Sequence, residues 1–146
     1  MKDTKKSVAE FIDFLKKKKI HIDSEMAKAV GKACALVQAE AQRGMTETQT
    51  NPEVAYGKQK HHPSLPYNPP AVDTGLLRMS ITYTVEETKN KVVGKVGSTL
   101  KNPPYGAYLE YGTSKMQPRP WLKPAVEKTS ARVKEILKSA NKEGLK

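Results

Sequence analysis

A single cysteine, Cys34, stands among the 146 residues. This excludes an internal disulfide framework and any zinc knuckle built on a CxxC pair. Two of the three histidines, His61 and His62, are adjacent, and no carboxylate or cysteine lies at ligand spacing from them. The sequence therefore predicts no metal and no cofactor, and it predicts Cys34 as an ordinary buried small residue.

Long apolar runs are also missing. No stretch approaches the ~20 residues that a membrane span needs. The basic first ten residues are not followed by the apolar segment of a signal peptide. We expect a protein made in a reducing cytoplasm, with no membrane contact, that folds as a single domain over residues 1–146.

Catalytic motifs are absent as well. The glycines Gly94, Gly97 and Gly106 lack the GxxxxGK[ST] context of a phosphate-binding loop. Glu110 stands close to two tyrosines, but the sequence nominates no partner carboxylate or base for it. No catalytic residue is predicted, and the protein is expected not to be an enzyme.

The chain is strongly basic. It has 26 Lys and Arg against 15 Asp and Glu, a formal charge of +11. Such a balance indicates an acidic partner. Lysine supplies most of the excess and occurs at both ends, which favours weak contact with DNA or an acidic protein over sequence-specific binding. A basic non-specific nucleic-acid-binding protein is therefore the alternative function.

Helical periodicity dominates the first 44 residues. Val8, Phe11, Ile12 and Leu15 fall at i, i+3, i+4 and i+7, which predicts an amphipathic helix over residues 4–19. A second helical stretch follows from about residue 23 to 43, with Gly44 as its stop and residues 20–22 as the joint. One long helix with a kink is the alternative.

Residues 45–72 are polar, contain five prolines and show almost no periodicity. A loop of this length inside a domain is unusual and tends to be functional or disordered. Two interpretations remain open, a disordered loop and an arm that orders against a neighbouring subunit.

From Ile81 the period drops to two, as in a half-buried strand. Further strands are predicted over residues 92–97 and Tyr105–Tyr111, with short links that favour an antiparallel meander. A final helix follows from about Arg119. The predicted fold class is α+β: an N-terminal helical segment (1–44), a long flexible loop (45–72), an antiparallel sheet of three to four strands (73–118) and a C-terminal helix packed on the sheet (119–146).

Two segments carry unusual residue patterns. In VDTGLLRMSI, residues 72–81, Asp73 or Thr74 is expected to cap a single turn and Gly75 to adopt a positive φ. Arg78 is expected to form an ion pair at the surface or in an interface.

In YGAYLEYGTSKMQPRPWLKPAVE, residues 105–127, two prolines keep the chain extended before the helix that begins at Trp121. Glu110 is expected at a strand end before a glycine turn. There it accepts backbone N–H bonds from the following loop, pairs with Arg119 or Arg78, or stays solvated.

Together these two segments resemble the signatures of small neck and tail-completion proteins of tailed phages, a tail-component family of the HK-ninety-seven gene-ten type. The second match spans over twenty residues. The chain departs mildly from the family with Pro118 and Trp121, where many members have Ala and Phe. The motif residues expected to form a structural or interface site are Asp73, Thr74, Gly75, Leu77, Arg78, Ser80, Tyr108, Glu110, Gly112, Thr113, Arg119, Pro120 and Trp121.

The resemblance implies a structural virion protein at the head–tail junction or in the tail. Its implied partners are other copies of itself, in a ring that is commonly hexameric in the virion and monomeric beforehand. Adjacent neck or tail-tube proteins are also implied, as is DNA that passes through the ring without specific recognition. A ring through which DNA passes should not bind the DNA tightly, so most of the lysine excess is expected outside the channel.

Overall fold

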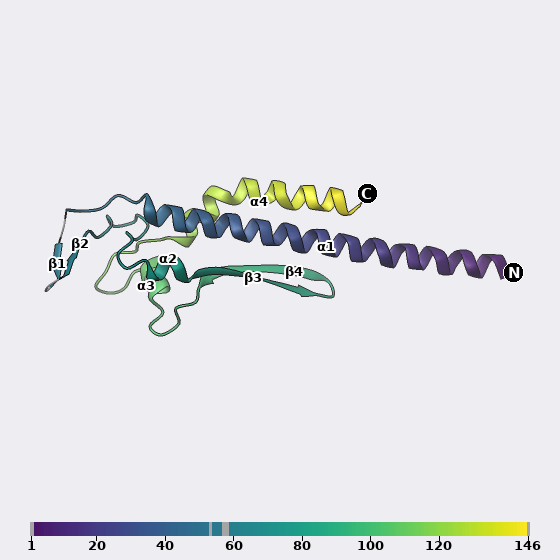
Figure 1. Ribbon diagram of the computed structural model, residues 1–146, viewed down its shortest axis with the longest axis horizontal. Helices are drawn as coiled ribbons and strands as arrows, with labels where there is room; N and C mark the ends of the chain where they lie inside the picture. The colour runs from purple at the N-terminus through teal and green to yellow at the C-terminus, as the bar shows by residue number, and fades with distance from the viewer. Residues whose placement is uncertain (1, 53, 57–58, 146) are drawn as a thin grey trace.

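The computed structural model describes residues 2–52, 54–56 and 59–145 (Figure 1). Helices and strands both contribute, so the α+β class is confirmed. The strands form two separate antiparallel pairs, β1 with β2 and β3 with β4. The elements in chain order are α1 (Lys2–Thr46), β1 (Val54–Tyr56), β2 (Gln59–His61), α2 (Leu76–Ser80), β3 (Ile81–Thr88), β4 (Lys91–Ser98), α3 (Tyr105–Tyr111) and α4 (Leu122–Gly144).

Helix α1 is one continuous helix of 45 residues. The predicted joint at residues 20–22 is therefore wrong, and the single long helix is the correct alternative. Neither proline nor glycine occurs between Ile20 and Ile22, so the hydrogen-bonded ladder has no reason to break there. At about 1.5 Å per residue the helix is roughly 67 Å long, and it runs almost the whole length of the molecule (Figure 1).

Both α4 and the β3–β4 hairpin pack against α1. Small side chains such as Ala29 and Ala33 are buried and permit this close approach. At the end of α4, a Cβ on Gly144 would lie 3.1 Å from Ile22. The core lies at the opposite end of α4, where its first residues meet the C-terminal part of α1 and the base of the β3–β4 hairpin. Its buried members are Val37, Ala41, Met45, Leu77, Ile81, Leu109, Trp121 and Ala125.

The predicted third strand is wrong, because Tyr105–Tyr111 forms helix α3. The sheet at residues 73–118 is accordingly a two-stranded hairpin, Ile81–Thr88 with Lys91–Ser98, and not a meander of three to four strands. The helix begins where a strand connection was expected. Pro104 is its N-cap, and its carbonyl accepts the N–H groups of Ala107 and Tyr108 at 3.0 and 3.2 Å.

Tertiary contacts explain why the aromatic run of this segment is helical. Gly106 and Leu109, three residues apart, are buried, and the tyrosines between and around them are exposed. This is the pattern of one buried helical face. The high strand propensity of tyrosine is therefore overridden by packing.

Part of the predicted loop, residues 45–72, has regular backbone structure. Helix α1 extends to Thr46, and the described residues between 49 and 65, here called the arm, form an extended antiparallel ribbon. Asn51 N donates to Pro63 O at 2.8 Å, and Leu65 N donates to Gln49 O at 3.1 Å. The arm projects beyond the C-terminal end of α1, opposite the N-terminus (Figure 1).

The C-terminal helix was predicted from about residue 119. It begins three residues later, at Leu122, and ends at Gly144. Pro124 lies in its first turn, where a missing N–H costs nothing. None of the described helices is apolar over enough residues to cross a membrane.

Candidate functional site

The two unusual sequence segments meet in space, and Gly106 lies at the point of contact. A Cβ at this position would lie 3.3 Å from Trp121 Cζ2, 3.4 Å from Ser98 Cβ and 3.5 Å from Leu77 Cδ1. Helix α3 therefore lies against α2, the end of β4 and the start of α4 through a residue without a side chain. We call this junction the corner.

The carboxylate of Glu110, in α3, caps the N-terminus of α4. Its Oε2 accepts the N–H groups of Trp121 at 2.8 Å and Leu122 at 3.0 Å, and its Oε1 accepts that of Lys123 at 2.9 Å. The first N–H groups of a helix have no partner within the helix, and the positive end of the helix dipole favours a carboxylate. Glu110 thus accepts backbone N–H bonds as predicted, although it lies in helix α3 and not at a strand end, and its donors stand at the start of α4.

Trp121 is buried at the corner and is 5% exposed. Its Nε1–H donates to the carbonyl of Gly106 at 2.9 Å, which ties the start of α4 to α3. Between them the chain reverses at Gly112, whose φ of 76° suits glycine. A Cβ there would lie 2.8 Å from Met116 O, and Thr113 N donates to that same carbonyl at 2.9 Å.

The two arginines of the motifs do not pair with Glu110 in the described structure, and an ion pair of Arg78 in an interface stays a prediction. Among the described residues, no ion pair joins Glu110 to Arg119 or Arg78, because the carboxylate is occupied by backbone N–H groups. The backbone N–H of Arg119 donates to Leu109 O at 2.6 Å, and Pro120 follows before α4. Arg78 instead donates from its guanidinium to Thr46 Oγ1 at 3.4 Å.

The segment from Asp73 to Ser80 forms the predicted capped turn. Thr74 Oγ1 accepts the N–H of Leu76 at 3.3 Å, and Gly75 has a φ of 78°. Ser80 Oγ donates to Leu77 O at 2.7 Å and lies 2.8 Å from Ser98 Oγ. These bonds fix α2 to the base of the hairpin.

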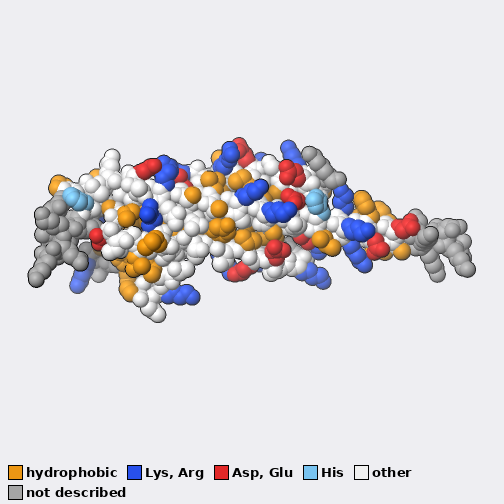
Figure 2. Space-filling model, viewed as in Figure 1, with side chains coloured by type: hydrophobic (Ala, Val, Ile, Leu, Met, Phe, Trp, Pro, Cys, Tyr) orange, Lys and Arg blue, Asp and Glu red, His pale blue; other side chains and the backbone are white. Residues whose placement is uncertain are grey.

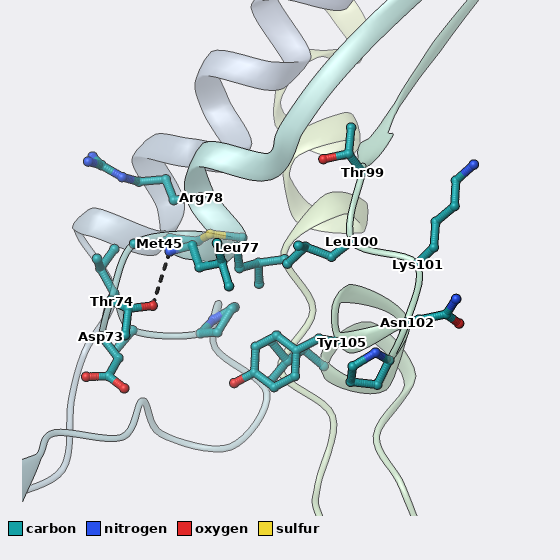
Figure 3. Close-up of a pocket in the computed structure, with 17 residues that line it drawn as sticks. Met45, Asp73, Thr74, Leu77, Arg78, Thr99, Leu100, Lys101, Asn102 and Tyr105 are labelled. Carbon is teal, nitrogen blue, oxygen red and sulfur yellow. Dashed lines mark hydrogen bonds between the residues drawn. The ribbon is translucent and has the colours of Figure 1, made fainter. Parts of the chain in front are cut away.

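Beside the corner lies a hollow of about 510 Å³ (Figure 3). It opens between the end of α1, helix α2, residues 99–103 and α3. Its wall is mainly apolar, and Leu76 and Tyr105 remain about half exposed there. Leu77, Leu100 and Tyr105 point into the space, while Asp73 lies at its edge (Figure 3). Such a surface can receive apolar side chains of a partner.

A second depression, here called the groove, lies along α1 between β4 and α4 and measures about 480 Å³. In Figure 2 hydrophobic side chains gather over the middle of the molecule, along α1. Burial raises the pKa of the Cys34 thiol, as expected for a small buried residue and not for a reactive one. The lining residues are Val30, Ala33, Cys34 and Val37 of α1, Val92, Val93, Gly94 and Val96 of β4, and Leu122, Val126, Val133 and Leu137 of α4.

The N-terminal part of α1, the described residues 2–18, extends past both α4 and the hairpin (Figure 1). We call it the overhang. Lys19 Nζ donates to Lys89 O at 3.3 Å, which marks where the hairpin tip meets α1. Beyond this point the predicted apolar face, from Val8 to Leu15, is exposed in the described structure, and Phe11 is 60% exposed.

Sequence reasoning missed the hollow and the groove. Neither depression has a local sequence signal, since each is lined by segments far apart in the chain. Within the described ranges, no group of three His, Cys, Asp or Glu side chains is placed to hold a metal ion.

Comparison with known proteins identifies a family whose match includes the first motif and residues 105–112 of the second. Residues 9–112 match the model of the HK97-gp10-like family, described as "Bacteriophage HK97-gp10, putative tail-component". The match covers more than half of the chain and includes the whole 72–81 motif. No curated protein and no solved structure gave a significant match. The chain therefore belongs to the HK97-gp10-like family of bacteriophage tail components.

Proposed function

We propose that this chain is a structural protein of a tailed phage or prophage virion, and that it joins head to tail or completes the tail by assembling into a ring. Its family supports a structural tail component. The observation that carries the ring is the overhang, whose apolar face continues the buried face of α1 but is bare. A contiguous bare apolar surface on a soluble domain marks a protein interface.

A cyclic ring requires two different surfaces on every copy, one for each neighbour. This chain presents such surfaces at separate places. The overhang lies at one end of α1, the arm and the hollow lie at the other, and the groove lies between them (Figure 1). Six copies are the number that the resemblance favours, with a monomer before assembly.

The further partners are the neighbouring neck or tail-tube proteins and the DNA that passes through the ring. A charge of +11 would bind DNA in a salt-dependent way if it lined the channel. We therefore place most of the lysine excess on the outside of the ring, facing acidic virion proteins. DNA is not recognised by sequence.

Native mass spectrometry and electron microscopy test the ring. We expect a closed ring of defined copy number, either for the chain alone at high concentration or after addition of its neck or tail-tube neighbours. A monomer under all of these conditions contradicts the proposal.

The net charge of +11 favours one other candidate, a non-specific nucleic-acid-binding protein. It predicts micromolar or tighter DNA affinity that falls steeply with salt. Filter binding at two salt concentrations separates the candidates, since a conduit should bind weakly at both. Tight, salt-sensitive binding by a chain that never forms rings would favour the alternative.

A further inference from the structure

The β3–β4 hairpin has a free edge that borders the groove. All eight residues of β4 pair with β3 in continuous register, from Lys91 opposite Thr88 to Ser98 opposite Ile81. In the described part of the chain, β4 pairs with no other strand. Its second edge faces α4 across the groove, because β4 and not β3 contributes the wall on that side.

Natural edge strands are usually guarded against pairing by proline, by bulges or by lysines that project from the edge. β4 contains no proline and no bulge. Lys95 could act as a guard, but its Nζ donates to both carboxylate oxygens of Glu86 at 2.8 Å. This bond draws the side chain across the hairpin towards β3, so the outer edge of β4 stays open.

The floor and far wall of the groove suit a strand better than a helix. A strand beside β4 would satisfy the free backbone groups of that edge. Every second side chain of this strand would point at the floor formed by Val30, Ala33 and Val37 of α1. A helix has its backbone bonded internally and would leave the edge unpaired.

We propose that the occupant is the arm of a neighbouring copy, which adds a strand to β4 and fills the groove. This inference rests on the proposed ring. The strands of the arm are already extended, and the described residues of its first leg, 49–52 and 54–56, are nearly as many as those of β4. Its Val54 and Tyr56 fall at alternate positions, the spacing of one strand face.

A second copy is inferred because the arm points away from its own groove. The arm projects beyond the C-terminal end of α1 (Figure 1), whereas the groove floor, Val30 to Val37, lies at least nine residues before that end. The contact between the arm and the groove is heterologous: each copy inserts its arm into one neighbour and accepts the arm of the other neighbour in its groove. When the rotation between copies closes, this contact generates a ring.

Cysteine cross-linking between two differently tagged populations tests the contact. One population carries Ala55→Cys in the arm, and the other carries Val93→Cys in β4. Mixed under ring-forming conditions and oxidised, they should give a covalent dimer that contains both tags. Unsubstituted chains, which keep Cys34, provide the background. A ring that yields no such dimer above background overturns the inference and leaves the proposed function standing.

A shortened arm gives a second readout. Asn51 and Pro63 are hydrogen-bonded neighbours, so a two-residue Gly-Ser turn in place of residues 52–62 should close the ladder without disturbing the body. We expect the shortened chain to melt like the original and to lose the ring. A ring that forms unchanged overturns the inference.

The groove can also be altered directly. Val126→Glu puts a charge on the α4 wall at a residue that is 46% exposed, so the fold should tolerate it. Ala131→Glu, on the exposed face of the same helix, is the matched control. We expect loss of the ring and of the cross-link for the first variant only. Equal assembly of the two variants counts against the groove as the docking site. A wild-type chain that stays monomeric under all conditions overturns both the proposed ring and the contact between arm and groove.

Discussion

Glu110 and Trp121 are joined across the turn between α3 and α4, where a carboxylate oxygen of Glu110 accepts the backbone N–H of Trp121 at 2.8 Å. The indole N–H of the same tryptophan returns to α3, at the carbonyl of Gly106. Together the two bonds fix the start of α4 against α3. The stability of the corner therefore depends on the side chains of Glu110 and Trp121.

The first prediction concerns Glu110→Gln. One amide oxygen can replace only part of a carboxylate that accepts three N–H groups, so we expect a loss of about 1–2 kcal/mol in the free energy of unfolding. Urea denaturation measures it. Glu87→Gln, at an exposed carboxylate on β3, is the control and should change little. Equal stability of the two variants would show that Glu110 is not a helix cap.

The second prediction concerns Gly106→Ala. The added methyl group meets Trp121, Ser98 and Leu77 at 3.3 to 3.5 Å, and overpacking of this kind typically costs about 1–3 kcal/mol. Gly97→Ala is the matched control, because a Cβ there meets nothing within 4 Å. Thermal unfolding should show a clear drop for the first variant alone. Similar melting temperatures for the two would contradict the close approach at the corner.

The third prediction separates assembly from folding. Phe11→Lys changes a residue of the overhang that is 60% exposed, so the melting temperature of the monomer should stay nearly constant. Assembly should weaken, because the bare apolar face is lost. Lys17→Glu, also exposed on the overhang, reverses a charge without removing apolar surface and is the comparison. Rings that form equally well from Phe11→Lys would exclude the overhang as an interface.

The fourth prediction concerns Cys34. Burial raises the pKa of its thiol, so the folded state keeps the proton to a higher pH than the unfolded state does. Alkylation near pH 8 should be slow in the folded chain and fast in urea. The same shift makes stability fall as pH rises from the pKa of the unfolded thiol through the higher pKa of the folded thiol. Equally fast alkylation in both states would contradict the burial of Cys34.

Much of the fold follows from local patterns. The apolar spacing from Val8 to Leu15 predicts a helix, the alternation after Ile81 predicts β3, and Gly75 predicts a turn with positive φ. Each of these signals lies within a few residues of the chain. The structure agrees because nothing distant overrides them.

The sequence predictions that differ from the structure do so for a physical reason. Tyr105–Tyr111 was predicted as a strand from its aromatic residues, but Trp121 and Leu77 decide its conformation through Gly106. Glu110 could be predicted as an acceptor of N–H bonds, whereas its donors lie 11 to 13 residues away at a helix start. The hollow and the groove depend on segments brought together only by folding.

The length of α1 fixes how its interaction surfaces are rotated relative to one another. One uninterrupted helix carries the overhang, the floor of the groove and, at Met45, a wall of the hollow. These surfaces are therefore set at fixed angles about one axis, about 100° per residue. One residue inserted after Lys19 would rotate the overhang face away from its partner, and a seven-residue insertion would bring it nearly back into phase.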